Sequence, residues 1–169
     1  QVLDSNIPSL VIATPAELHY KLARQGLEAG KHVFVEKPLA LAAREAEELC
    51  QLAEHKGQVL MVGHLLQYHP AFLKLKELVH DGTLGELQYV YSNRLNLGKI
   101  RREENSLWSF APHDISMILS LVGEEPDTVT ATGAAYQHET IADVTTTQLT
   151  FPGGVRGHVF VSWLHPFKE

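Results

Sequence analysis

The chain of 169 residues is 44% hydrophobic and 20% charged, which are ordinary proportions for a soluble globular protein. Its formal net charge of −6 argues against nucleic acid or an anionic membrane surface as a partner, since neither attracts an acidic protein. The sequence has no apolar run of 18 residues, no basic-then-apolar leader and only one cysteine, so we expect a cytoplasmic protein without a membrane span or an internal disulfide.

The first third of the chain predicts short apolar strands that alternate with helices. The strands are expected at residues 10–13, 32–35 and 59–62, and the helices between them at 16–29 and 42–56. Gly30 and Gly57 follow the last helical residues, where glycine commonly ends a helix. This alternation implies strand–helix–strand crossovers and therefore a parallel sheet.

The remainder of the chain is predicted to be mostly β-structure. We expect a helix at 70–80, a strand at 87–96, a helix at 112–121, and strands at 128–136, 144–151 and 155–163. The turn Pro152-Gly153-Gly154 joins the last two strands as a hairpin. Long alternating strands with helices on one side indicate an α+β domain with an open, largely antiparallel sheet. We expect the exposed face of this sheet to form the interface of a homo-oligomer.

Two kinds of site have little support in the sequence. The ten histidines are scattered, show no His-x-x-x-His spacing and have no cysteine cluster beside them, so no metal site is expected. Cys50 lies on the predicted apolar stripe that contains Ala46, Leu49 and Ala53. It is interpreted as a buried filler rather than as a nucleophile.

The tripeptide Glu36-Lys37-Pro38 is the most informative feature, because it closes a buried strand and opens a helix. In an open α/β sheet, ligands bind in the crevice beyond the carboxyl ends of the strands. A lysine held there by stiff backbone is a candidate for chemistry. From the tripeptide alone, a solvated lysine at a strand end is the alternative.

The usual phosphate-binding loop of a nucleotide-binding sheet is missing. Such a sheet normally begins with a strand, the loop Gly-x-Gly-x-x-Gly and a helix, and no such loop occurs in these 169 residues. Three parallel strands would also leave apolar edges uncovered. We therefore expect a fragment, with the C-terminal part of a parallel nucleotide-binding sheet at residues 1–65 and a truncated α+β domain at 66–169.

Several motifs, in their order and spacing, resemble one family. They are Val11-Ile12-Ala13-Thr14-Pro15 with His19, Glu28-Ala29-Gly30-Lys31-His32-Val33, Glu36-Lys37-Pro38-Leu39-Ala40, Val62-Gly63-His64 and Gln67-Tyr68-His69-Pro70-Ala71-Phe72. Over essentially the whole chain, the sequence resembles the NAD(P)-dependent oxidoreductases related to glucose-fructose oxidoreductase and inositol dehydrogenase. The segment 93–114 is most similar to the branch that oxidises UDP-N-acetyl sugars and their uronic acids at C3.

The resemblance implies a Rossmann domain followed by an α/β substrate domain, in a chain about twice this length. It implies NAD or NADP as cofactor, and hydride transfer between nicotinamide C4 and a carbon of a sugar or sugar nucleotide. Lys37 would be the active-site lysine beside the alcohol, and the Lys37-Pro38 peptide would be cis, the form that proline allows at least cost. Partial desolvation would let this lysine act as acid or base near neutral pH. Glu36 would orient Lys37 or contact the cofactor, and a plain ion-pair partner is the alternative.

His113 is the second candidate catalytic residue. We expect it at the start of a helix, just after Pro112, where the helix dipole disfavours imidazolium and leaves the ring able to accept a proton. Asp114 in the same first turn would suit the dipole as a carboxylate near the cap. Inositol dehydrogenase-like members carry an aspartate four residues before this histidine, and here that position is Ser109. A Lys-His pair is therefore our hypothesis, and a polyol substrate has less support.

The remaining candidates are expected around the same crevice. Thr14 and Pro15 would border the nicotinamide half of the cofactor, and Pro38 is a further candidate for cofactor binding. His19 is expected about one turn into the following helix, where it would face the same crevice and contact the cofactor. A capping or solvated histidine is the alternative. Arginines can clamp a diphosphate or a carboxylate with paired hydrogen bonds. The candidate substrate-binding residues are Arg94, Asn96, Arg101, Arg102, Asn105 and Trp108. A solvated loop, in which Glu103 and Glu104 neutralise the arginines, is the alternative.

Other functions remain open at this point. An NAD-dependent glycosidase of the same fold also begins with oxidation at C3, and a few relatives are non-catalytic regulators that bind a dinucleotide. The presence of both Lys37 and His113 favours an enzyme, because a sensor has no use for a proton-transfer pair. The fragment itself is expected to be inactive. Nothing in the sequence decides between NAD and NADP or identifies the sugar.

Overall fold

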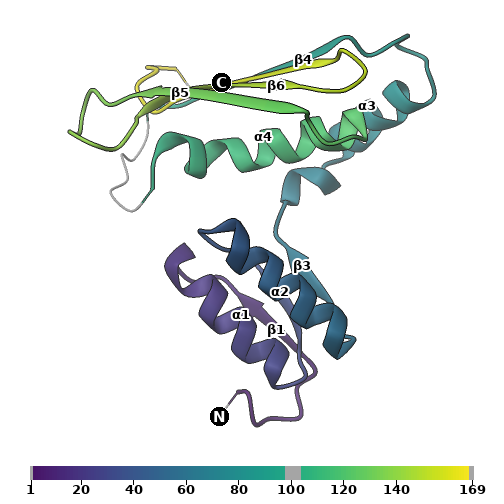
Figure 1. Cartoon of the computed structure of the whole chain (residues 1–169), viewed down its shortest axis with the longest axis vertical. Coiled ribbons are helices and arrows are strands. Elements are labelled where there is room, and N and C mark those ends of the chain that lie inside the picture. The colour runs from purple at the N-terminus through teal and green to yellow at the C-terminus, as the bar shows by residue number, and fades with distance from the viewer. Residues whose placement is uncertain (1, 98–103, 168–169) are drawn as a thin grey trace. The chain divides into compact units, whose positions relative to one another are not determined.

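The computed structural model describes residues 2–97 and 104–167, and the chain folds as two compact units (Figure 1). The first unit comprises residues 1–64 and the second unit residues 65–169. The sequence analysis placed the division after residue 65. Each unit has its own hydrophobic core, so each can be understood from its own residues.

The first unit is a three-stranded parallel sheet with two main helices (Figure 1). The strands β1 (Ser9–Ile12), β2 (His32–Val35) and β3 (Leu60–Val62) lie in the order β1-β2-β3, so β2 is the central strand. The short 3-10 helix η1 (Ala16–Leu18) and helix α1 (His19–Glu28) connect β1 to β2, and α2 (Ala43–Lys56) connects β2 to β3. The predicted crossovers and parallel sheet are confirmed.

The sequence explains how the helices cover this sheet. Alternate residues of a strand share a face, so Val33 and Val35 point to the same side and are buried together with Leu27 of α1. Gly26 lets α1 approach the sheet closely, because a Cβ atom there would lie 2.9 Å from Cγ2 of Val33. Gly57 ends α2 in the left-handed conformation, with φ of 63°.

The opposite face of the first sheet is apolar. Val11 is 75% exposed and Met61 is also exposed, and the strand register aligns both of them with Phe34 of β2. Contiguous apolar surface of this kind commonly marks a contact with another part of a protein or with a partner.

The prediction that Cys50 is buried was wrong, because its side chain is exposed. Leu49 and Ala53 of the same predicted stripe are buried. Successive helical residues point about 100° apart, so a helix that turns Leu49 to the core turns the next side chain toward solvent.

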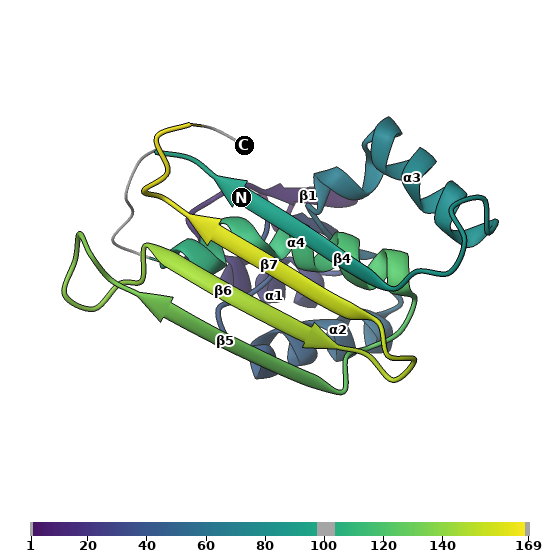
Figure 2. The ribbon, with the colours of Figure 1, turned by 90° about the horizontal axis from the view of Figure 1, so that it is seen from above.

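The second unit is a four-stranded sheet with a long helix along one face (Figure 2). After the short 3-10 helix η2 (Leu65–Tyr68), its elements are α3 (Pro70–His80), β4 (Tyr89–Leu95), α4 (Ser106–Val122), β5 (Thr128–Ala134), β6 (Val144–Thr150) and β7 (Arg156–Ser162). The strand order is β4-β7-β6-β5. The pairs β7–β6 and β6–β5 are antiparallel and the pair β4–β7 is parallel, so the expected largely antiparallel sheet is confirmed.

One face of this sheet forms the core of the second unit with α4. Ala111 and Ile118 of α4 are buried with Val159 and Val161 of β7. Residues of the other register point away from α4. Among them, Tyr91 of β4 stacks on His158 of β7, with ring centroids 5.4 Å apart.

The start of α4 differs from the prediction. The helix begins at Ser106 rather than at residue 112, and Pro112 lies inside it. Proline is common in the first turn of helices, which made residue 112 a plausible start. The true start is set by Asn105, whose side-chain oxygen accepts a hydrogen bond from the backbone N–H of Trp108 at 3.1 Å. No helix among the described residues is long and apolar enough to cross a membrane.

Candidate active site

In the first unit, Lys37 lies where strand ends converge. The backbone N–H of Glu36 donates to the carbonyl of Ile12 at 2.9 Å, and that of Gly63 donates to the carbonyl of Val35 at 2.8 Å. These bonds tie the carboxyl ends of β1, β2 and β3 together. Lys37, half-buried, follows at the end of the central strand. This edge of a parallel sheet is where ligands bind in open α/β folds.

A buried histidine connects the turns that follow β1 and β2. The Nδ1 atom of His19 lies 2.6 Å from the carbonyl oxygen of Pro38, and its Nε2 atom lies 2.8 Å from that of Thr14. The residue is only 1% exposed. The structure therefore brings His19, Thr14 and Pro38 together, and His19 contacts their backbone. The Lys37-Pro38 peptide is cis, as the family resemblance implied.

Glu36 and Gly63 are in close contact at the same edge. A Cβ atom at position 63 would lie 3.1 Å from Oε2 of Glu36 and 3.2 Å from its Oε1. The carboxylate of Glu36 is therefore turned toward the end of β3, over a residue without a side chain. Glycine at position 63 leaves the space that this carboxylate uses.

His64 is a residue of this edge that the sequence analysis did not select. Burial of its ring, and to a smaller degree the positive charge of Lys37, lowers the pKa of His64 from the usual histidine value. A perturbed titratable group at a strand end is a signal of a functional site. His64 was part of Val62-Gly63-His64, one of the motifs that carry the family resemblance. The sequence gave no reason to assign a role to its imidazole.

The residues of this edge fit the nicotinamide end of a dinucleotide. Ala13, Thr14 and Pro15 are exposed beyond β1, so their backbone is available to border a planar ring. Glu36 and Lys37 supply polar groups beyond β2, the neighbouring strand. The chain contains no Gly-x-Gly-x-x-Gly loop for the diphosphate, so the fit concerns the nicotinamide end alone.

In the second unit, an ion pair joins β4 to α4. Nε of Arg94 donates to Oδ2 of Asp114 at 2.7 Å, and Nη2 donates to Oδ1 at 2.9 Å. Ser92 Oγ also donates to Oδ1, at 2.8 Å. Asp114 is 2% exposed, whereas the side chain of Arg94 is 31% exposed. The paired donors that the sequence analysis reserved for a substrate anion are therefore directed at a carboxylate of the protein.

The expected placement of His113 and Asp114 in the first turn of a helix was wrong. Seven residues of α4 precede His113, which puts it roughly two turns from the N-terminus. The helix dipole acts within the first turn, so it does not explain a neutral imidazole at this position. His113 is half-buried, and its carbonyl accepts a hydrogen bond from Ser116 Oγ at 2.8 Å. Asp114 is an ion-pair partner rather than a cap.

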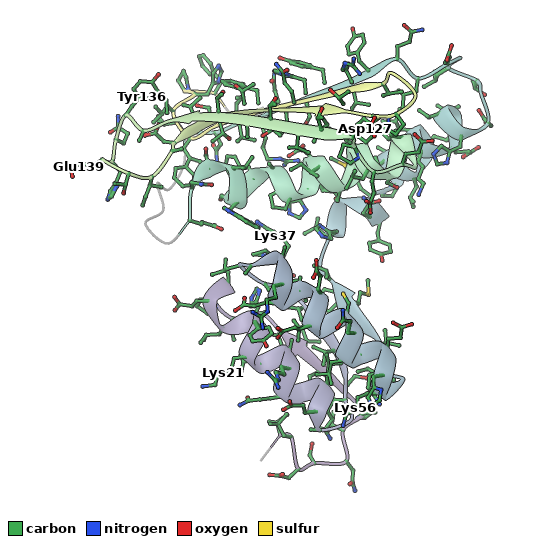
Figure 3. All side chains as sticks on the ribbon, viewed as in Figure 1. Lys21, Lys37, Lys56, Asp127, Tyr136 and Glu139 are labelled. Atoms are coloured by element: carbon green, nitrogen blue, oxygen red, sulfur yellow. The ribbon has the colours of Figure 1, made fainter. Side chains whose placement is uncertain are left out.

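Of the other candidate substrate residues, those that the structure describes lie at one end of the second sheet. Asn96 follows β4 and donates its backbone N–H to the carbonyl of Ser162 at 3.1 Å. Asn105 caps α4 through Trp108, whose side chain is 41% exposed. Arg101 and Arg102 lie outside the described residues. Lys37 belongs to the first unit (Figure 3), and the residue range of the second unit includes His113.

Metal ligands are not grouped in the part of the chain that the structure describes. No set of three or more histidine, cysteine, aspartate or glutamate residues is arranged to hold an ion there.

A parallel sheet with a lysine at its carboxyl edge, followed by an α+β unit with an open sheet, is typical of two-domain nicotinamide-dependent oxidoreductases. Comparison with protein families agrees with this class. Residues 1–64 match the oxidoreductase family with an NAD-binding Rossmann fold, and residues 72–169 match the GFO/IDH/MocA C-terminal domain. The chain belongs to the GFO/IDH/MocA family of oxidoreductases.

Known members of the family are similar over most of this chain. It is 39% identical to the uncharacterized oxidoreductase YdgJ of Escherichia coli over 71% of this chain and 37% of that protein. It is 30% identical to UDP-N-acetylglucosamine 3-dehydrogenase of Acidithiobacillus ferrooxidans over 94% of this chain and 49% of that protein. The crystal structure of GenD2 from gentamicin A biosynthesis, in complex with NAD, superposes with a TM-score of 0.91 at 27% identity, covering 98% of this chain and 51% of that one. The chain thus spans at most about half the length of these proteins.

Proposed function

We propose that this chain is part of an NAD- or NADP-dependent dehydrogenase that oxidises a hydroxyl group of a sugar or sugar nucleotide. The preferred substrate is a UDP-N-acetyl sugar or its uronic acid, oxidised at C3 to the ketone. The observation that carries the proposal is the position of Lys37 at the carboxyl edge of the central strand, in a chain of this family. The similarity to UDP-N-acetylglucosamine 3-dehydrogenase over 94% of the chain supports this substrate class.

The proposed reaction combines transfer of a hydride with transfer of a proton. A nicotinamide held beside Thr14 and Pro15 would supply the acceptor for the hydride that leaves the carbinol carbon. Lys37 and His113 are the proposed proton-transfer pair: one of them takes the hydroxyl proton as the carbonyl forms, and the other passes that proton on to solvent. Lys37 suits this task because it is half-buried at the carboxyl edge of the central strand, where ligands bind in open α/β folds. Glu36 orients the lysine or contacts the cofactor.

Binding of the two ligands is divided between the units in this proposal. Thr14 and Pro15 border the nicotinamide, and His19 and Pro38 hold the turns from which that border is made. Asn96, Asn105, Arg101, Arg102 and Trp108 supply the polar and aromatic groups for the sugar nucleotide. Arg94 was a candidate for this set in the sequence analysis, but two of its nitrogen atoms bind Asp114, so we leave it out of the proposed substrate contacts.

The decisive experiment uses the complete gene product, because these 169 residues contain no glycine loop for the diphosphate. Nicotinamide absorbance should rise when UDP-N-acetylglucosamine or its uronic acid is added with NAD or NADP. Deuterium placed at C3 of the sugar should appear on the reduced cofactor and should slow the reaction. Lys37→Met and His113→Asn should abolish turnover, whereas Lys56→Met, at the far end of the first unit, should leave it unchanged (Figure 3).

Each alternative predicts a different result in the same assay. Oxidation of myo-inositol without oxidation of any UDP-sugar would assign a polyol substrate. Release of a free sugar without net cofactor reduction would indicate a glycosidase, and dinucleotide binding without turnover would indicate a regulator. Full turnover by Lys37→Met would contradict the mechanism.

Two further properties belong to the same proposal. We expect a cytoplasmic homo-oligomer that associates through the face of the second sheet that carries Tyr91 and His158. Substituting Tyr91 with lysine should place a charge in that interface and shift the protein to a smaller species in sedimentation experiments. An unchanged sedimentation coefficient would argue against this interface.

A further inference from the structure

Asp114 is a buried carboxylate whose role the proposed reaction does not require. It accepts three hydrogen bonds, two from Arg94 and one from Ser92. Ser92 and Arg94 are two residues apart on β4, so both side chains leave the strand on the face turned toward α4. The carboxylate therefore attaches one turn of α4 to one strand, at the residue that directly follows His113.

The helix has a weak point immediately before this attachment. Pro112 lies within α4 and has no backbone N–H, so it cannot donate to the carbonyl of Trp108 four residues earlier. Its ring also crowds that carbonyl. The turn that leads to His113 thus has one hydrogen bond fewer than a regular helix and depends more on contacts outside the helix.

We infer that Arg94 and Ser92 hold Asp114 in order to set the orientation of His113. Neighbouring residues on a helix project about 100° apart. Fixing Asp114 against β4 fixes the rotation of this turn about the helix axis, and with it the direction in which the imidazole leaves α4. Arg94, Ser92 and Asp114 are then positioning residues, an assignment that rests on the proposed role of His113 in proton transfer.

This role differs from a contribution to stability alone. Replacing a buried ion pair by apolar residues is often neutral for stability, because desolvation of the two charges offsets their attraction. What the pair does provide is one defined geometry, since a guanidinium and a carboxylate with two parallel hydrogen bonds fit in a single arrangement. The positioning role also differs from a role of Arg94 in binding a substrate anion. Loss of such a substrate contact would change KM.

The experiment compares graded variants of the complete gene product with UDP-N-acetylglucosamine as substrate. Ser92→Ala removes one hydrogen bond, Arg94→Lys keeps the charge without the paired donors, and Asp114→Asn removes the ion pair. Lys74→Met is the matched control, because it breaks the exposed Lys74–Glu77 ion pair of α3, with an N–O distance of 2.7 Å. Variants are compared after size-exclusion chromatography and circular dichroism have verified that they are folded.

We expect kcat to fall in a graded series while KM stays within about two-fold of the wild-type value. The loss should be a few-fold for Ser92→Ala, about 10-fold for Arg94→Lys and up to about 100-fold for Asp114→Asn, since a small displacement of a catalytic group has effects of this size. Amide hydrogen exchange in residues 110–117 should accelerate in the same order. Lys74→Met should change neither kcat nor exchange in this segment.

Other outcomes overturn the inference. A raised KM with unchanged kcat in Arg94→Lys would make Arg94 a substrate-binding residue instead. Lower stability with full kcat in the folded protein would make the pair structural only. If the wild-type protein oxidises no UDP-sugar, the proposed function fails, and hydrogen exchange still tests the attachment: unchanged exchange at 110–117 in Asp114→Asn would refute it.

Discussion

The Nδ1 atom of His19 lies 2.6 Å from the carbonyl oxygen of Pro38, nineteen residues further along the chain. The other ring nitrogen lies 2.8 Å from the carbonyl oxygen of Thr14. The imidazole thus holds the turn after β1 at a set distance from the turn after β2. These turns border the edge at which Lys37 is found, so a residue that is itself 1% exposed helps to shape an exposed site.

Removal of this link should destabilise the first unit. His19→Ala removes a buried side chain and leaves the buried carbonyl of Pro38 without this partner, and a buried acceptor that loses its partner costs about 1–3 kcal/mol. We expect the free energy of unfolding to fall by about 2–4 kcal/mol in urea titrations. His19→Gln should lose less, because its amide can still donate. His55→Ala, which removes an exposed histidine of α2, is the control and should have little effect. Equal stability of His19→Ala and His55→Ala would show that the two contacts contribute nothing.

Gly63→Ala should separate the shape of the site from the stability of the fold. The new methyl group would lie 3.1 Å from Oε2 of Glu36, so the carboxylate must move by a few tenths of an ångström. Glu36 is a flexible side chain, and stability should therefore change by less than about 1 kcal/mol. Cofactor affinity or kcat should decrease if Glu36 orients Lys37 or contacts the cofactor.

The chain offers a matched control for that substitution. Gly153 lies in the β6–β7 turn, and a Cβ atom there would meet no atom within 4 Å. Gly153→Ala should therefore leave both the unfolding transition and the kinetic constants unchanged. If Gly63→Ala has unaltered kinetics as well, the position of the Glu36 carboxylate is irrelevant to the reaction.

The pKa of His64 predicts a pH-dependent contribution to stability. Its pKa is lower in the folded protein than in the unfolded chain, so the unfolded chain binds the proton first as pH falls. No stability is lost well above the unfolded value of about 6.5, and stability decreases as pH falls below it toward the folded value. His64→Asn, which does not titrate, should show a shallower decrease in the free energy of unfolding over this range. Identical slopes for the two proteins would contradict the lowered pKa.

The same residue also reports on Lys37. Removing the ammonium in Lys37→Met removes one of the two causes, so the pKa of His64 should rise while remaining below the usual histidine value, because burial persists. Nuclear magnetic resonance titration of the His64 ring measures this change directly. Lys56→Met should leave the titration unaffected, since Lys56 lies at the opposite end of the first unit (Figure 3). If the pKa of His64 is the same in Lys37→Met as in the wild-type protein, the ammonium of Lys37 lies too far from the ring to influence it.

Local patterns were sufficient to predict the first sheet and the place of Lys37 in it. Apolar strands, glycine stops and the strand-end tripeptide are all features of adjacent residues, and parallel crossovers follow from their order. The partners of His19 and Asp114 could not be predicted in this way. Asp114 lies 20 residues from Arg94, and only the packing of α4 against β4 brings the two side chains together.

The misplaced start of α4 has a similar origin. Pro112 satisfied the local rule for a first helical turn, but Asn105 satisfied the rule for a cap, and sequence alone offered no way to rank the two. The consequence for function was direct, because the electrostatic argument for a neutral His113 depended on the helix starting at residue 112. In the structure, contacts with β4 take the place of the helix dipole as the feature that distinguishes this turn.

The cap itself provides the final prediction. Asn105→Ala removes the acceptor for the backbone N–H of Trp108, and loss of an N-cap costs about 1 kcal/mol. The first turn of α4 should exchange its amide hydrogens faster, whereas the turn around Asp114, held by Arg94, should keep its protection. Asn105→Ser retains an oxygen that can accept the same bond and should restore most of the loss. If Asn105→Ser binds substrate more weakly although the cap is restored, Asn105 contacts the sugar nucleotide in addition to capping the helix. If both variants bind substrate normally, the role of Asn105 is confined to the start of α4.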